Sequence, residues 1–223
     1  MDDYSYRRAL QWATALGGPL FERYKAKPPY GVYECAKARF DAAGLLAAQG
    51  NIRDASGVRD MAERVWAGVY NPGFQQIRLL LAGLTLSERR AYVDSLPADS
   101  DRYRFVYTVN QYMDRLPPAG IAAWDLGQLA FHIRCARLAG HIGENEENAY
   151  LLHNAVRVRF SYRSWPDYAV AYMAGKQYGE EDLSEERSEL NLEQLRRLLT
   201  GKNSPWRELE WDIVLPEPPA LPE

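Results

Sequence analysis

Apolar side chains recur every three or four residues along most of the chain, which is the pattern of amphipathic helices. The pattern is densest from Gly120 to Gly140, where one predicted helix is apolar on two sides. These two sides consist of Leu126, Leu129, Ala130 and Ile133, and of Trp124, Phe131 and Leu138. A helix of this kind usually runs through the middle of a helical domain. The sequence therefore predicts an all-α fold, a single multi-helix domain with residues 120–140 at its centre.

Other helices are predicted on both sides of this central one, joined by short connections that favour antiparallel neighbours. Their approximate ranges are 3–16, 32–49, 56–70, 74–82, 85–96, 100–116, 142–162, 164–175 and 191–200. Ser56 and Asn191 are predicted N-caps, because a side-chain oxygen at that position accepts a backbone N–H. Thr85 and Glu88 have the spacing of a capping box. The run 71–73, Asn-Pro-Gly, predicts a turn.

Two segments alternate apolar and polar residues, as half-buried strands do. Residues 156–163 also fit helical spacing together with Leu151 and Ala155, so a helix is predicted there. Residues 208–215 are predicted to form an extended C-terminal arm. The residues from 216 to 223 are rich in proline and are predicted to be a mobile tail. Residues 1–215 then form the single domain.

Composition and terminal sequence are typical of a cytoplasmic protein. Hydrophobic residues make up 47% and charged residues 26% of the chain, as in ordinary globular domains. The first residues contain no apolar segment of signal-peptide length. The longest apolar run, residues 77–86, is too short to span a bilayer, so no membrane partner is expected. Cys35 and Cys135 lie far apart without metal or redox spacing, which indicates reduced thiols.

Negative charge is concentrated towards the C-terminus. Residues 177–223 contain 5 basic and 12 acidic side chains, whereas residues 1–176 contain 22 and 18. The acidic residues gather in the segment 179–193. This segment is either a surface that attracts a basic partner or a solvated loop and helix start. Acidic groups suit the first turn of a helix, which favours the second interpretation.

The central helix has a polar side that carries the best candidates for chemistry. Asp125, Gln128, His132 and Cys135 follow one another at helical spacing. Asp125 and His132 are candidates for an acid and a base at a pocket, or for metal ligands. Residues seven apart lie about 10.5 Å apart along a helix axis, which is too far to chelate one ion directly. The favoured interpretation is structural, with Asp125 capping a helix or pairing with an arginine such as Arg134 or Arg163.

Motifs of the common catalytic and binding classes are missing from the sequence. There is no nucleophile elbow, no P-loop and no dinucleotide-binding glycine motif. No metal and no cofactor are therefore predicted. The three residues Arg157, Arg159 and Arg163 would suit contact with a phosphate backbone. An isoelectric point near 5.7 argues against a nucleic-acid partner.

Several residues after the central helix have patterns typical of fold determinants. Ser164 is a predicted cap with Trp165 as a packing anchor, and Gly175 is predicted to permit close helix contact. The run 204–206, Ser-Pro-Trp, predicts a cap followed by a docking ring.

These residues together resemble the bacterial DUF1266 family, a domain of unknown function. The matching positions are Trp124, Asp125, Leu126, Arg134, Gly140, Ile142, Glu146, Ser164, Trp165, Tyr172 and Gly175. The resemblance is best over residues 120–211. The chain departs from the pattern at Gln128 and Lys176, where the family has arginine, and at His141, where it has an aromatic residue. The resemblance implies a domain and no reaction.

Two hypotheses for function follow. The first is a non-catalytic protein-binding module of unknown partner, such as a toxin-neutralising (immunity-type) or adaptor protein. The second is an enzyme with an unrecognised polar site around Asp125, His132, Arg134 and Glu146. The candidate binding or family-motif residues are Trp124, Asp125, Arg134, Glu146, Ser164, Trp165 and Gly175.

Overall fold

The computed structural model describes residues 2–23, 41–179 and 184–221, and these residues form helices and no strand. The helices are α1 (Asp3–Ala15), α2 (Gly18–Arg23), α4 (Ala42–Gly50), α5 (Ala55–Ala67), α6 (Asn71–Ala82), α7 (Leu86–Asp94), α8 (Asp101–Tyr112), α9 (Ala122–Leu138), α10 (Glu144–Ser161), α11 (Trp165–Gly179), α12 (Glu185–Thr200) and α13 (Pro205–Glu208). The predicted all-α fold is confirmed.

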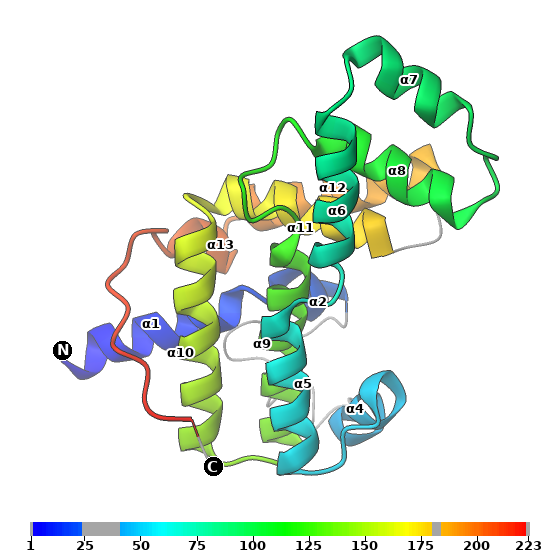
Figure 1. Ribbon diagram of the computed structural model, residues 1–223. Coiled ribbons are helices and arrows are strands. Elements are labelled where there is room, and N and C mark those ends of the chain that lie inside the picture. Colours follow the sequence, from blue (N-terminus) through cyan, green and yellow to red (C-terminus); the bar gives the residue numbers. More distant parts are fainter. Residues whose placement is uncertain (1, 24–40, 180–183, 222–223) are drawn as a thin grey trace.

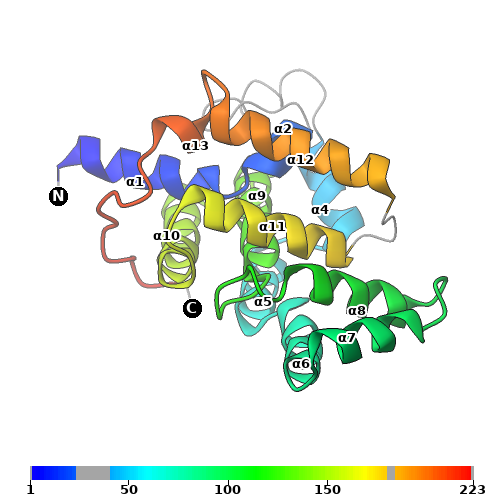
Figure 2. The ribbon, with the colours of Figure 1, turned by 90° about the horizontal axis from the view of Figure 1, so that it is seen from above.

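Helix α9 is the centre of the fold, as predicted. It contacts α1, α2, α4, α5, α10 and α11, and the two ribbon views show these helices around it (Figures 1 and 2). Eleven of its 17 residues are buried. A helix enclosed in this way has almost no solvated side, so each of its polar groups needs a partner within the protein.

Small residues allow α9 and α11 to pack closely. A Cβ atom on Gly175 would lie 2.4 Å from the Cβ atom of Trp124. A Cβ atom on Gly127 would lie 2.7 Å from the hydroxyl oxygen of Tyr168. Both distances are too short for any larger residue without movement of a helix. The predicted role of Gly175 in close helix contact is confirmed.

Helices α6, α7 and α8 project from one side of the molecule (Figure 1). α6 and α7 pack on α8, and α8 packs on α11. Tyr178 at the end of α11 joins the two parts, since its ring lies 5.8 Å from Phe74 and 4.6 Å from Phe105. The turns after α8 are held by Arg78, which donates to the carbonyl oxygens of residues 113, 116 and 117.

The predicted boundaries of α5 and α6 were wrong. α5 is capped by Asp54 and not by Ser56, because the Asp54 carboxylate accepts the N–H of Gly57 at 2.9 Å. It ends at Ala67 and is followed by the C-cap Gly68, whose φ of 99° favours glycine. The predicted turn at residues 71–73 is the first turn of α6, where proline costs no hydrogen bond.

The starts of α4 and α12 also differ from the prediction. Residues 24–40, which include the first half of the predicted helix 32–49, lie outside the described residues. α4 begins after Asp41, whose side chain caps it. α12 begins after Ser184, which accepts the N–H of Arg187. The predicted cap Asn191 is instead buried inside α12 and accepts a hydrogen bond from Lys176.

The C-terminal arm docks on the body of the same chain, as predicted. Ser204 caps the single turn of α13. The Trp206 ring stacks on Trp165 with 5.2 Å between ring centroids, and its Nε1 donates to the carbonyl oxygen of Ala15. The Nε1 of Trp165 donates to the carbonyl oxygen of Leu209 at 2.7 Å. Residues 209–221 then continue without a helix or strand.

The last described residues lie beside α10 (Figure 1). The carbonyl oxygen of Pro219 is 2.9 Å from Nε2 of His153. Residues 222 and 223 are outside the described part of the chain. Mobility of the tail from residue 216 stays a prediction.

We predict that the arm and the tail contribute very differently to stability. Deletion after Leu215 should leave the melting temperature nearly unchanged, whereas deletion from Pro205 onward should lower it substantially or make the protein insoluble. The longer deletion removes Trp206 and Leu209, which are only 3% and 6% exposed. Each such side chain contributes roughly 1.5–3 kcal/mol when buried. A thermal melt of both truncations is the measurement, and an unchanged melt for the longer deletion would contradict the docking described above.

Candidate functional site

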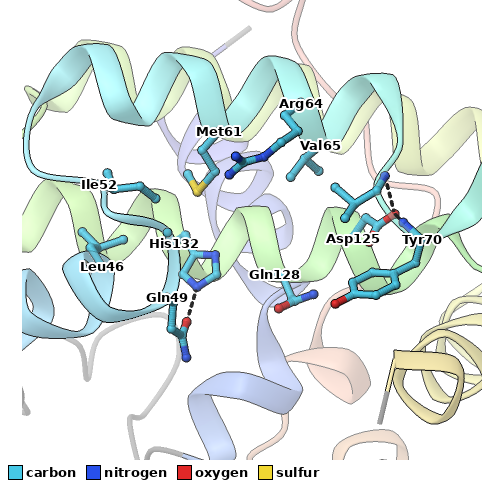
Figure 3. A pocket seen from close by; sticks show the side chains of 12 residues that line it. Leu46, Gln49, Ile52, Met61, Arg64, Val65, Tyr70, Asp125, Gln128 and His132 are labelled. Carbon is cyan, nitrogen blue, oxygen red and sulfur yellow. Dashed lines mark hydrogen bonds between the residues drawn. The ribbon is translucent and has the colours of Figure 1, made fainter. Parts of the chain in front are cut away.

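A cleft of about 330 Å³ lies beside α9, bounded by the end of α4, by α5 and by the segment that joins α5 to α6 (Figure 3). Its apolar lining consists of Leu46, Ile52, Met61, Val65 and Val69. Its polar lining consists of Gln49, Arg64, Tyr70, Asp125, Gln128 and His132. Its size is in the range of ligand-binding sites, and its lining is more polar than theirs usually is.

The polar side of α9 predicted from the sequence faces this cleft. Asp125, Gln128 and His132 all line it, because residues three or four positions apart share one side of a helix. Cys135, the fourth residue of that side, is fully buried. Burial raises the pKa of its thiol to about 12, so the sulfur is protonated and unreactive at neutral pH.

The Asp125 carboxylate binds the backbone at the start of α6. Its Oδ2 accepts the N–H of Val69 at 3.2 Å and the N–H of Tyr70 at 3.1 Å (Figure 3). Tyr70 is the N-cap residue of α6 and makes no side-chain cap of its own, so Asp125 supplies a carboxylate from another helix. The predicted pairing with Arg134 or Arg163 was therefore wrong, whereas the alternative prediction of a capping role is confirmed.

Burial governs the protonation of Asp125. The side chain is only 3% exposed, and desolvation raises its pKa above the usual value for aspartate. The backbone N–H groups of residues 69 to 71 oppose this shift, because they stabilise the charged form. The net shift upward shows that desolvation outweighs these hydrogen bonds.

His132 lies at the other end of the polar side, where Gln128 separates it from Asp125 (Figure 3). Its Nε2 is 2.7 Å from Oε1 of Gln49. Burial lowers the pKa of His132 to about 4, so the imidazole is neutral at pH 7. A neutral ring that faces an amide oxygen carries its proton on Nε2. No hydrogen bond joins His132 to Asp125 in the described structure, so the two do not form an acid–base pair.

Arg134 and Glu146, the other two residues of the hypothetical enzyme site, do not line the cleft. Nη1 of Arg134 forms a buried ion pair with Oε1 of Glu147. Burial raises the pKa of Glu147, and the neighbouring Arg134 opposes that shift. Glu146 accepts the N–H of Gly143 at 2.8 Å and so caps α10. The four predicted residues therefore do not form one site.

Glu147 is the partner that sequence reasoning missed. A signal for it exists, because Glu147 shares a helical side with Leu151, Asn154 and Val158, all of which are buried. An acidic residue on a buried side requires a cationic partner or hydrogen-bond donors within the protein. The remaining cleft residues gave no such signal, since Gln49, Arg64 and Tyr70 come from elements that meet only in the folded chain.

The other family-motif residues form structural contacts. The Trp124 ring lies 5.1 Å from that of Tyr172, between α9 and α11. Ser164 accepts the N–H of Asp167 at 3.1 Å and caps α11. Trp165 holds the C-terminal arm.

Among residues 2–23, 41–179 and 184–221, no group of three or more His, Cys, Asp or Glu side chains is placed to hold a metal ion. The helices in the same part of the chain include none that is long and apolar enough to cross a membrane.

The fold and the cleft define an all-α protein with a polar pocket against its central helix. Residues 46–211 match the family described as "Protein of unknown function (DUF1266)", and the chain belongs to that family. The sequence resemblance was best over residues 120–211, and the family match begins well before that range. It includes the elements that form the cleft. No curated protein and no solved structure matches the chain.

We predict that Asp125→Ala lowers the free energy of unfolding by roughly 2–4 kcal/mol, because two N–H groups at the start of α6 lose their acceptor. Asp125→Asn keeps an acceptor oxygen and removes the desolvated charge, so it should cost about 1 kcal/mol or less. Urea denaturation of both variants and the wild type is the measurement. Equal losses in the two variants, or no loss in Asp125→Ala, would show that these hydrogen bonds do not stabilise the fold.

Proposed function

We propose that the protein is a non-catalytic protein-binding module. The observation that carries this proposal is that the family-motif side chains are engaged with their own chain. Asp125 binds the start of α6, Arg134 binds Glu147, and Trp165 binds the C-terminal arm. Side chains that are engaged in this way stabilise the fold, and the surface of that fold would then bind the partner.

The surface that we propose for the partner is the outer side of α12. Glu186, Glu189, Leu190 and Glu193 recur there at helical spacing. α12 lies along the outer edge of the molecule, with its other side on α11 and α2 (Figure 2). Leu190 is 58% exposed on this side. Leu190 lies among the carboxylates of this side, and an interface that combines apolar contact with charge would use both.

Charge determines the kind of partner that this surface suits. Carboxylates flank Leu190 on this side, so a complementary protein would carry lysine or arginine around an apolar contact. A toxin-neutralising (immunity-type) protein and an adaptor are the two roles that we propose within this class, in the bacterial cytoplasm. In the first role the captured partner is toxic when expressed alone, and in the second it is not.

The alternative hypothesis is an enzyme whose site includes Asp125 and His132. These two residues do share the cleft. Protein binding is favoured over this alternative because Arg134 and Glu146 point elsewhere and His132 contacts Gln49.

The test is a charge reversal on α12. A tagged wild-type protein and the variant Glu186→Lys/Glu189→Lys should be used to capture proteins from a bacterial host lysate. We expect the wild type to capture a basic partner in a salt-sensitive manner and the variant to capture about tenfold less, because like charges now oppose each other. The captured protein is then purified, and its binding to both forms is measured directly.

A matched control reverses two exposed acidic side chains on a different surface, Asp94→Lys/Asp99→Lys, with the same change in net charge. This control should capture the partner as well as the wild type does. Equal loss in both variants would indicate a non-specific charge effect, and unchanged binding of the purified partner to the α12 variant would contradict the proposed interface.

A further inference from the structure

The cleft beside α9 contains two groups of opposite charge, Asp125 and Arg64, whose hydrogen-bonding capacity is not fully satisfied by the described residues. Oδ1 of Asp125 is buried and accepts no hydrogen bond from the described residues, although Oδ2 accepts two. The guanidinium group of Arg64 lines the same cleft, and no hydrogen bond or ion pair joins it to another described residue. A buried carboxylate oxygen without a donor is unfavourable, so a donor from a bound ligand would stabilise it.

The arrangement of these groups is ordered along the cleft (Figure 3). Asp125 lies at one end beside Tyr70. Arg64 reaches over the middle of the cleft from α5, and the amide of Gln128 lies across from it on α9. The other end is lined by the apolar side chains of Leu46, Ile52 and Met61.

We propose that the cleft binds a small zwitterion that carries an ammonium group, a carboxylate group and an apolar body. An amino acid with an apolar side chain is the simplest molecule of this class. The ammonium group would donate to Oδ1 of Asp125, and the carboxylate would accept from the guanidinium group of Arg64. The apolar body would lie against the end of the cleft that contains Leu46 and Ile52.

Size and charge both favour this class of ligand. A cavity of about 330 Å³ suits a molecule of this size. A zwitterion satisfies both charged groups and brings no net charge into the cleft. A simple amine would leave Arg64 without a partner, and a simple acid would place a carboxylate near Asp125 without compensation. Arginine also binds a carboxylate with two parallel hydrogen bonds, which fixes the orientation of the ligand.

This inference goes beyond the proposed protein binding, because the cleft is formed by α4, α5 and α9 and the partner surface by α12. The two proposals are tested with variants on different helices, so the failure of one is distinguishable from the failure of the other. A zwitterion bound in the cleft would link α5 to α9 and would stabilise the folded chain by mass action.

The experiment is calorimetric titration and thermal melting of the full chain with matched probes. L-leucine, L-methionine and 6-aminohexanoate test zwitterions with different separations between the charged groups. 3-methylbutylamine is leucine without its carboxylate, and 4-methylpentanoate is leucine without its ammonium group. We expect at least one zwitterion to bind and raise the melting temperature. Each probe with a single charge should bind about tenfold more weakly.

Variants assign the binding to the cleft. Arg64→Met should weaken binding of the zwitterion about tenfold without unfolding the protein, since Arg64 is exposed. Asp125→Asn should weaken it by removing the anion. The control Arg90→Met removes an exposed arginine from α7 and should bind as the wild type does.

Three results would overturn the proposal. The first is that none of the zwitterions binds. The second is that 3-methylbutylamine binds as tightly as the zwitterion, which would make the cleft a cation site. The third is that Arg64→Met binds as tightly as the wild type, and this result remains decisive even if Asp125→Asn does not fold.

Discussion

The carboxylate of Asp125 joins the central helix to the part of the molecule that projects from it. α9 is enclosed by its neighbours, so its one buried acidic side chain must be satisfied by the protein. It is satisfied by the N–H groups of Val69 and Tyr70, where α5 ends and α6 begins. This contact fixes the direction in which α6 leaves α5. It also closes one end of the cleft, so the fold and the candidate site depend on the same side chain.

The family motif therefore has a physical interpretation in this chain. Asp125 positions α6, Arg134 and Glu147 neutralise each other inside the packing of α9 on α10, and Trp165 and Trp206 stack to hold the C-terminal arm. The cleft is what these contacts leave open. Oδ1 of Asp125 on α9 and the guanidinium group of Arg64 on α5 have no hydrogen-bond partner among the described residues, and this arrangement motivates the proposed ligand.

Local signals in the sequence predicted much of this structure. The central helix followed from apolar residues on two sides, the capping box from Thr85 and Glu88, and the docked arm from Ser204 and Trp206. Contacts between distant segments were not predictable in the same way. Asp125 binds backbone N–H groups, which every residue except proline has, so its partners left no sequence signal. The sequence predicted Asn191 as the N-cap of α12, but the cap is Ser184, so local cap preferences did not locate this helix start.

Amide hydrogen exchange, measured in the Asp125→Ala variant and in the wild type, tests whether this carboxylate joins α6 to α9. If the carboxylate holds α6 on α9, the amide protons of residues 69–82 should exchange faster in the variant than in the wild type. The amides of α9, α10 and α11 should keep their protection, because their packing does not involve this hydrogen bond. Exchange that is unchanged at residues 69–82, or that rises equally in all helices, would contradict the role assigned to Asp125.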